Sequence, residues 1–588
     1  MSGQSVVLPP KKEFRSLLMN KIIKTERRTT VQAHFGPGLT YEGPVGTTVE
    51  EFLNIAQPSV MGRSVAALVN GKLRELTKEL THDADIVPVT TADSDGSRIY
   101  RRSLTFLVIA AAAEVFPEHT IIVHHSMPFG GYYCERDDEQ PLTDEELQAL
   151  EKRMRQLVAD DLPIRQIRMP LGEALELFRK QGDMEKADLF SRRRKDYLTL
   201  YELNGSRDYF HGFMVPRTSY LDLFALHHYS NGFIFQFPRR QWPDVLQPFE
   251  DEPRLARVFR DYQDWLSIMG VASVTGLNKE IRSGRTGDVV LIAEAFHSRQ
   301  LSSIAQEIAS KQPQVKIVMI SGPTSAGKTT FSKRLAIQLL ANGIFPVTIA
   351  LDNYFVNRDD TPRDEHGEFD FEALEALDLA LFTKQMRQLL KGEKIICPLF
   401  NFRSGQREWG DQLAIGSDQI IIIEGIHGLN PALITGIPEK AVYRIFVSAF
   451  TQLNIDKHNR VPTTDTRLLR RIVRDAAHRG YTAADTIRRW PSVRRGEKRY
   501  IFPYQNNADR FFNSALVYEL SLLKRLAQPL LLQVEPGTPE RVEANRLLAF
   551  LQWFEPIPIA EQQMIAGDSI IREFIGNSIL EDYEPWNR

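Results

Sequence analysis

Short apolar runs alternate with amphipathic stretches along the C-terminal half of this 588-residue chain. Four runs are apolar at nearly every position, as in strands buried on both faces; they cover 315–320, 346–351, 419–424 and 442–448. The stretches between them carry the spacing of apolar positions that is typical of helices. This alternation predicts an α/β fold with a parallel sheet flanked by helices on both faces.

The region 30–91 instead combines short strands with turn-forming residues. Strands are expected at 30–35 and 65–69, and Asn70-Gly71 after the second strand is a strong hairpin signal. A capped helix is expected to begin near Thr47, between the two strands. These features predict a small α+β module.

Helix and strand patterns are mixed between residues 95 and 235. The most apolar stretch, 104–116, predicts a buried helix, because it is too short to span a bilayer and contains Glu114. Thr143 and Glu146 form a capping box that opens a second helix. We therefore expect a second α+β domain and no membrane segment.

Composition and charge are those of an ordinary globular protein, with 43% hydrophobic and 25% charged residues. The net charge of −2 argues against nucleic-acid binding driven by bulk electrostatics, and leaves local basic patches open. Cys134 and Cys397 lie too far apart for a zinc or disulfide pattern, and the N-terminus lacks a signal-peptide core. These observations favour a cytoplasmic protein.

One junction between a predicted strand and a predicted helix carries a phosphate-binding pattern, G-x-x-x-x-G-K-[ST]. Its glycines allow the backbone to wrap around phosphates. Lys328 can reach the outer phosphates, and the Thr329 hydroxyl can ligate magnesium. We expect a nucleoside triphosphate to be held by Gly322, Pro323, Thr324, Ser325, Ala326, Gly327, Lys328, Thr329 and Thr330.

Two carboxylates end the strands that follow this loop. Asp352 comes directly after the strand at 346–351, and Glu424 ends the strand at 419–424. The carboxyl ends of parallel strands meet at the ligand crevice, where Asp352 could deprotonate an acceptor hydroxyl and Glu424 could join a metal shell. From position alone, a helix N-cap is an equally good interpretation of Asp352.

Arginines recur on one helical face near residue 470. Arg467, Arg471 and Arg474 are spaced at i, i+4 and i+7, and Arg479 lies just beyond them. A solvated basic face is the ordinary interpretation of this pattern by itself. In a triphosphate enzyme, clustered arginines are more consistent with a lid over the transferring phosphate.

The run from Ile317 to about Leu531 resembles the uridine–cytidine kinase and phosphoribulokinase branch of P-loop kinases. The likeness rests on the phosphate loop and on the motif Asp352-Asn-Tyr-Phe355. It implies an enzyme that uses ATP and Mg²⁺, with Asp352 as general base. It also implies a magnesium shell of Thr329, Asp352 and Glu424, and phosphate-gripping lid arginines at Arg471, Arg474 and Arg479.

The acceptor motifs depart from those of the family's nucleoside kinases. The ribose-binding motif reads Phe369-Asp-Phe-Glu372, and the base-binding motif reads Pro398-Leu-Phe400-Asn-Phe402-Arg-Ser-Gly405-Gln-Arg407, without the family's tyrosine and histidine. A further lid arginine is replaced by Tyr481. Losing polar groups that read the base predicts altered base selection. The residues expected to bind the acceptor are Phe355, Phe371, Glu372, Phe400, Phe402 and Arg407.

The N-terminal half resembles parts of threonyl-tRNA synthetase. Residues 30–91 resemble a TGS domain, and 95–235 resemble the second additional, editing-type domain, through 130–135, 141–146 and 169–178. The synthetase's four functional histidine and cysteine positions fall on residues without that chemistry: Arg102, Phe106, Phe210 and Met214. We therefore expect no hydrolase activity here, and leave an RNA end, a small nucleotide or a partner surface as the ligand of this half.

These observations predict a flexible basic arm, a TGS-like domain, an editing-like domain, a connector, a kinase domain and a C-terminal tail, at 1–29, 30–93, 94–240, 241–312, 313–560 and 561–588. The expected function is ATP-dependent phosphorylation of a small-molecule hydroxyl acceptor, a nucleoside. Two alternatives stay open: a kinase of a non-nucleoside sugar or sugar phosphate, and an RNA-associated P-loop NTPase or regulatory module. The sequence does not choose between a monomer and a homo-oligomer.

Overall fold

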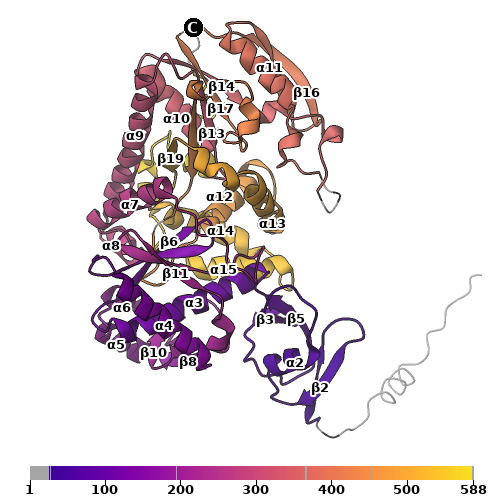
Figure 1. Ribbon diagram of the computed structural model, residues 1–588, viewed down its shortest axis with the longest axis vertical. Helices are drawn as coiled ribbons and strands as arrows, with labels where there is room; N and C mark the ends of the chain where they lie inside the picture. Colours follow the sequence, from indigo (N-terminus) through magenta and orange to yellow (C-terminus); the bar gives the residue numbers. More distant parts are fainter. Residues whose placement is uncertain are drawn as a thin grey trace, which may run out of the picture.

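The computed structural model describes residues 26, 28–193, 195–364, 367, 369–416, 418–451 and 453–585 (Figure 1). The basic arm expected over 1–29 therefore lies almost entirely outside the described residues. Within them, no helix is long and apolar enough to cross a bilayer.

A parallel sheet organises the C-terminal half, as the apolar runs predict. The four expected strands are confirmed, and a fifth joins them at the edge, in the order β14-β17-β13-β18-β19. Their bounds are β13 Ile317–Ser321, β14 Phe345–Ala350, β17 Gln419–Glu424, β18 Val442–Ser448 and β19 Arg510–Asn513. The fifth strand was not predicted, because four residues are too few to show a strand pattern.

Helices cover both faces of this sheet, and some come from the predicted connector. Helix α10 follows β13, and the long connector helix α9 packs along it (Figure 1). The connector helices share one buried apolar cluster with the phosphate-loop helix, so 241–312 contributes to the core of the kinase domain. Their bounds are α7 Pro253–Ile268, α8 Val274–Arg282, α9 Thr286–Ser310 and α10 Lys328–Ala341.

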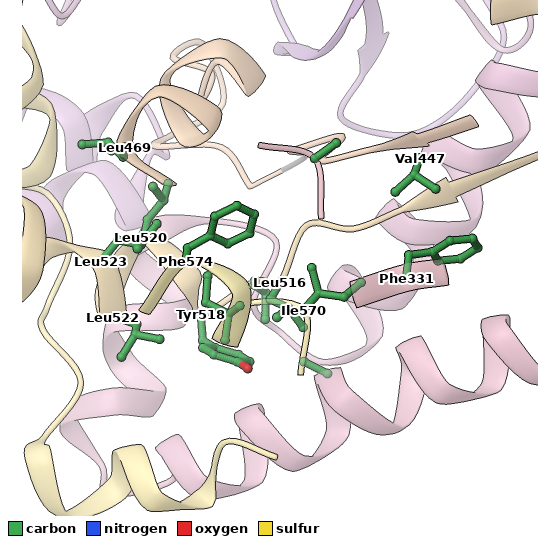
Figure 2. Close-up of a cluster of buried hydrophobic side chains, with 14 of the residues drawn as sticks. Phe331, Val447, Leu469, Leu516, Tyr518, Leu520, Leu522, Leu523, Ile570 and Phe574 are labelled. Atoms are coloured by element: carbon green, nitrogen blue, oxygen red, sulfur yellow. The ribbon is translucent and has the colours of Figure 1, made fainter. Parts of the chain in front are cut away.

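The C-terminal segment is also part of that core, although a tail is predicted over 561–588. Ile570 and Phe574 are fully buried and lie close to Leu516, Tyr518 and Phe331 (Figure 2). The segment therefore packs behind the phosphate loop. The helices of this region are α12 Thr463–His478, α13 Ala483–Tyr500, α14 Glu519–Leu532, α15 Pro539–Leu551 and α16 Arg572–Ile575.

A smaller lobe projects from the open edge of the sheet beyond β14. It contains helix α11 and an antiparallel hairpin, β15 and β16 (Figure 1). The bounds are α11 Leu379–Leu390, β15 Ile395–Asn401 and β16 Gln406–Leu413. The hairpin carries three of the six residues that sequence analysis assigns to the acceptor: Phe400, Phe402 and Arg407.

The TGS-like module forms a separate five-stranded sheet with one helix, and its predicted strands, hairpin and capped helix are confirmed. Thr48 caps the helix in a capping box with Glu51. The elements are β1 Thr30–His34, β2 Thr40–Pro44, α2 Val49–Ala56, β3 Ser64–Val69, β4 Lys72–Arg74 and β5 Ala84–Thr90.

The editing-like domain contains two antiparallel sheets around the predicted buried helix, which is confirmed as α3. The capping box at Thr143 is confirmed at the start of α4. The elements are α3 Ser94–Val115, β6 Ile121–Met127, β7 Gly131–Arg136, α4 Asp144–Ala159, β8 Arg165–Pro170, α5 Leu171–Lys180, α6 Met184–Ser191, β9 Tyr197–Leu203, β10 Ser206–Asp208, β11 Ala225–Tyr229 and β12 Gly232–Gln236.

The loop between β18 and α12 connects the C-terminal half to the editing-like domain through buried polar contacts. The Lys457 carbonyl accepts a hydrogen bond from the Val123 amide at 2.9 Å. The buried Lys186 ammonium pairs with Asp208 at 2.6 Å, and His458 from the loop contacts the same carboxylate. Because buried charges are costly unless they are paired, this network favours a fixed arrangement of the two domains.

Candidate functional site

The phosphate loop follows β13 and leads into the first turn of α10. At Gly322, an added Cβ would lie 1.9 Å from the Val447 carbonyl oxygen, and at Gly327 it would lie 2.4 Å from Ile570. Gly327 also has a φ of 84°, which favours glycine. Close approach and backbone conformation thus explain both glycines of the motif.

Lys328 and Thr329, the first residues of α10, face the end of strand β17. The Thr329 hydroxyl donates to the Glu424 carboxylate at 3.3 Å, and the Lys328 ammonium lies 3.9 Å from the same carboxylate. Lys328 also donates to the Pro323 carbonyl at 3.4 Å. The structure therefore brings together Lys328, the predicted phosphate-binding lysine, and two of the three predicted metal ligands, Thr329 and Glu424.

Asp352 lies just beyond β14, which pairs with β17 so that Ala350 is level with Glu424. Partial desolvation raises the pKa of Asp352, and the nearby charges of Lys328 and Arg479 act in the opposite direction. Burial, reinforced by Asp352 and Glu573, raises the pKa of Glu424 to about 7 against the effect of Lys328. Several carboxylates thus share the charge of one ammonium group.

This excess of negative charge is the environment that a divalent cation neutralises. The predicted ligands Thr329, Asp352 and Glu424 offer only oxygen donors, which suit Mg²⁺. They include two carboxylates, and the described part of the chain contains no cluster of three or more His, Cys, Asp or Glu side chains that could hold a metal by themselves. The residues therefore fit a magnesium ion that shares its coordination with phosphate and water.

Helix α12 presents its arginines to the phosphate loop in two layers. In the buried layer, Arg467 donates to the Thr324 carbonyl at 2.9 Å, and Arg470 donates to the Ser325 carbonyl at 3.4 Å. These two side chains hold the loop in shape. Sequence analysis did not assign this role to either residue, since spacing alone does not distinguish buried arginines from exposed ones.

The outer layer contains the predicted lid arginines, grouped around the buried Asp475. Arg471, Arg474 and Arg479 lie 3.1, 2.9 and 3.7 Å from its carboxylate. Arg471 also donates to the Thr324 hydroxyl at 3.3 Å, and the charge of Arg479 acts on Asp352. One carboxylate therefore orients three guanidinium groups beside the phosphate loop.

Glu497 is a site residue that sequence analysis missed. It is fully buried, pairs with Arg467 and Arg494, and accepts a hydrogen bond from the Thr324 amide at 3.1 Å. Its neighbour Gly496 packs against the side chain of Glu372. Glu497 stands in an arginine-rich stretch, where one acid gives no signal of its own.

Glu372, a predicted acceptor residue, interacts with the charges of Lys328, Arg471 and Asp352. We call the region around these residues and Glu424 the kinase cleft. Burial raises the pKa of Glu372 to about 7, with a further contribution from Glu497, while Arg471 and Lys328 act in the opposite direction. These interactions place Glu372 near the phosphate loop, on the side of Asp352.

The predicted aromatic residues gather into one cluster, which we call the aromatic shelf: Phe355, Phe371, Phe400 and Phe402. The ring of Phe355 lies 5.5 Å from that of Phe400 and 6.4 Å from those of Phe371 and Phe402. Phe355 and Phe400 are buried, whereas Phe371 is 40% and Phe402 60% exposed. The shelf therefore has a packed base and an exposed edge.

Arg407 supports this shelf from within the protein. Its guanidinium pairs with Asp378 at 2.9 Å and donates to the Phe355 carbonyl at 2.9 Å. These contacts occupy much of its hydrogen-bonding capacity, and they hold the backbone that carries Asp352 and Phe355.

The C-terminal segment supplies another carboxylate that sequence analysis did not place here. Glu573 accepts hydrogen bonds from the Thr330 amide at 3.2 Å and from the Thr330 hydroxyl at 3.0 Å. It thereby caps the first turn of α10 beside the phosphate loop.

In the editing-like domain, the four substituted positions are packed against protein. Arg102 donates to the Phe213 carbonyl at 2.6 Å. Phe106 and Phe210 lie 5.1 Å apart, and both rings are buried, as is the side chain of Met214. All four positions are therefore occupied by side chains that contact other protein groups.

Comparison with known proteins agrees with both halves of the chain. Residues 317–520 match the family model of the phosphoribulokinase / uridine kinase family. The N-terminal half is similar to threonine–tRNA ligases, with 30% identity over 185 residues to that of Desulforamulus reducens and 33% over 164 residues to that of Laribacter hongkongensis. These matches cover 31% and 28% of this chain, but only 29% and 26% of the ligases.

Two solved structures were also found to be similar. A putative fructose transport system kinase from Silicibacter sp. TM1040 is 21% identical, with 36% of this chain and 98% of that chain covered and a TM-score of 0.26. A possible uridine kinase from Bacillus stearothermophilus is 18% identical, with 25% and 79% covered and a TM-score of 0.22.

Proposed function

Because residues 317–520 match the model of the phosphoribulokinase / uridine kinase family, we propose that this chain transfers the γ-phosphate of ATP to a hydroxyl group of a nucleoside. The observation that supports a nucleoside is the exposed edge of the aromatic shelf. Phe371 and Phe402 are both exposed, and their rings lie next to that of Phe355, which follows Asp352 by three residues. A base stacked on this edge would bring its ribose toward the carboxylates.

The donor side is formed by the phosphate loop and Lys328. Backbone amides at the start of α10 face the triphosphate, and the Lys328 ammonium contacts its outer phosphates. Thr329, Asp352 and Glu424 would hold magnesium, which neutralises charge on the transferring phosphate when it is bound. The outer arginines add positive charge on the opposite side.

On the acceptor side, Asp352 receives the proton of the attacking hydroxyl. Desolvation raises the pKa of Asp352, which favours proton acceptance, while the charges of Lys328 and Arg479 favour the ionised carboxylate. Glu372 accepts hydrogen bonds from the remaining sugar hydroxyls. Both carboxylates lie near Lys328, so that nucleophile and donor meet in one cleft.

Base selection is expected to differ from that of a uridine kinase. The shelf consists of phenylalanine rings, which stack on any base and form no hydrogen bonds with its edge. Hydrogen-bonding groups provide the strongest discrimination between similar substrates. We therefore expect several nucleosides to be accepted at comparable rates.

An acceptor screen tests this function. The full chain is incubated with ATP and Mg²⁺ and with a panel of nucleosides, sugars and sugar phosphates, and products are detected by the mass of one added phosphoryl group. A phosphorylated nucleoside that is absent with Asp352→Asn supports the proposal. A phosphorylated sugar or sugar phosphate alone would change the acceptor class, and RNA-stimulated ATP hydrolysis without any such product would favour an NTPase switch.

A further inference from the structure

A large cavity lies between the editing-like domain and the C-terminal helices of the kinase domain. It encloses about 920 Å³, and we call it the interdomain cavity. Its walls include α3, the segment after β12, and α13 and α15; Figure 1 shows α3 beside α15. Its volume is typical of small-molecule sites. Asp352, Glu372 and Glu424 are not among its lining residues, so the cavity is distinct from the kinase cleft.

Five cationic side chains meet in this cavity: Arg101, Arg239, Arg240, Arg494 and Lys498. Burial and the charges of the four arginines together lower the pKa of Lys498 to about 7. Among the described residues, the side chains of Lys498, Arg239 and Arg240 form no hydrogen bond or ion pair. Like charges held this close are unfavourable unless an anion occupies the space between them.

Three of the carboxylates that line the cavity are paired with arginines outside the group around Lys498. Glu543 pairs with Arg98 at 3.0 Å, and Asp465 pairs with Arg546 at 2.6 Å. Glu540 pairs with Arg488 at 2.8 Å. The charge of Glu250 acts on Arg239, and that of Asp93 acts on Arg240. The charges that act most strongly on Lys498 itself are all arginines, so positive charge is in excess around this side chain.

Aromatic side chains line the same space. Phe237 and Tyr132 lie 4.9 Å apart, and Arg101 stacks over Phe237 at 5.5 Å. Trp242 is 48% exposed and also lines the cavity. Aromatic faces beside clustered cations are the arrangement that binds a base together with its phosphates.

We propose that the interdomain cavity binds a nucleotide with at least two phosphates, and that this second nucleotide regulates the kinase site. The cations around Lys498 would bind the phosphates, and Phe237, Tyr132 or Trp242 would stack the base. Both domains form the walls of the cavity, which favours a small molecule over a polymer. Binding at this site does not depend on the proposed acceptor.

An ion network connects this cavity to the phosphate loop. Arg494, which lines the cavity, pairs with Glu497 at 2.5 Å, and Glu497 accepts the Thr324 amide of the loop. Arg467 also lines the cavity and donates to the Thr324 carbonyl. A bound phosphate that attracts Arg494 would weaken its pairing with Glu497, and the hydrogen bond at Thr324 would change with it.

Calorimetric titration of the full chain with ADP, GDP, CDP and UDP tests the binding site. We expect two sites per chain in the wild type and one in Lys328→Met, which disables the phosphate loop. The double variant Arg240→Gln/Lys498→Gln should retain the phosphate-loop site and bind at the second site at least 10-fold more weakly. Retention of the first site shows that the variant is folded. Arg257→Gln, an exposed change outside the cavity, should retain both sites.

Three outcomes would overturn the assignment. The first is a single nucleotide site in the wild type, and the second is unchanged binding in Arg240→Gln/Lys498→Gln. The third is binding of a short single-stranded RNA at the cavity without binding of the diphosphates, which would assign the cavity to a polymer.

Kinetics test the regulatory part separately. A nucleotide that binds only at the phosphate loop competes with ATP and leaves kcat unchanged. If the cavity regulates the enzyme, a diphosphate should change kcat in the wild type and act as a simple competitor in Arg240→Gln/Lys498→Gln. Pure competition in both proteins would leave a binding site without a regulatory role and overturn that part of the proposal.

Discussion

The kinase cleft and the substituted pocket of the editing-like domain differ in how their polar groups are satisfied. In the cleft, Asp352 and Glu424 share the charge of Lys328, and burial raises the pKa of both carboxyls. In the pocket, Arg102 donates to a carbonyl, while Phe106 and Phe210 pack together. The first region keeps charged groups available for a ligand, and the second uses its side chains for packing.

This difference separates similarity of fold from similarity of chemistry. Sequence similarity to a ligase extends over about as much of the chain as the kinase family match does. The kinase cleft contains carboxylates, a lysine and arginines, whereas three of the four substituted positions in the editing-like pocket carry apolar side chains. Chemistry therefore depends on the side chains that the fold leaves without protein partners, and changes in each region should affect different properties.

The largest expected effect follows the loss of the proposed base. Asp352→Asn keeps the size of the side chain and removes its ability to accept a proton. We expect kcat to fall by about 10²–10⁴, as is usual for general bases, while ATP binding changes little. Product formation by mass spectrometry and ATP titration by calorimetry measure the two properties.

Asp359→Asn is the matched control, because this exposed aspartate lies on the same loop. It should leave kcat within about twofold of the wild type. Near-normal turnover in Asp352→Asn would show that Asp352 is not the base. The proposed chemical difference between the kinase cleft and the substituted pocket would then lose its main support.

In the packed pocket, truncation should affect stability and leave the chemistry of the kinase intact. Phe210→Ala removes a buried ring that packs against Phe106, and we expect a loss of about 3–5 kcal/mol in the free energy of unfolding of this domain. Denaturant unfolding measures that loss. Neither the wild type nor Phe210→Ala should deacylate mischarged tRNA. Deacylation by the wild type would show that the pocket has retained hydrolase chemistry.

Sequence alone could locate the parts of the kinase cleft that lie at strand ends. Asp352 and Glu424 follow buried apolar runs, and parallel strands bring such ends to one edge of the sheet. The phosphate loop carries a specific motif, so its position and its neighbouring helix were also predictable.

Residues that reach the cleft from distant segments gave no such signal. Glu497 contacts the loop amide of a residue 173 positions away, and Glu573 contacts one 243 positions away. Neither stands in a motif, and their contacts depend on how α13 and the C-terminal segment pack. Periodicity describes local structure, whereas these contacts are set by tertiary packing.

The crowded carboxylates of the cleft predict a pH dependence that the packed pocket lacks. The pKa of Glu424 rises from 4.5 to about 7 on folding, so the folded state favours the protonated form. Stability should therefore decrease between about pH 4.5 and 7, by up to about 3 kcal/mol, and Mg²⁺ should restore part of it near pH 7. Thermal unfolding measured across this range with and without MgCl₂ checks both effects.

Glu424→Gln should reduce the loss of stability between about pH 4.5 and 7, because the amide does not titrate. Glu393→Gln, an exposed change in the smaller lobe, should leave that loss unchanged. If the wild type, Glu424→Gln and Glu393→Gln lost stability equally with pH, the pKa of Glu424 would not be raised on folding. The inferred excess of negative charge in the cleft would then be wrong.

The smallest effect concerns Glu573, which belongs both to the packed core segment and to the charged cleft. Its carboxylate caps the Thr330 amide, but it also places negative charge beside the proposed triphosphate site. Glu573→Gln should lower the free energy of unfolding by about 1 kcal/mol and tighten ATP binding about two- to fivefold, because screened repulsion is removed. Glu581→Gln, an exposed change in the same segment, should alter neither property. Weaker ATP binding in Glu573→Gln would instead mean that this carboxylate helps to bind the nucleotide, which would place the C-terminal segment within the donor site.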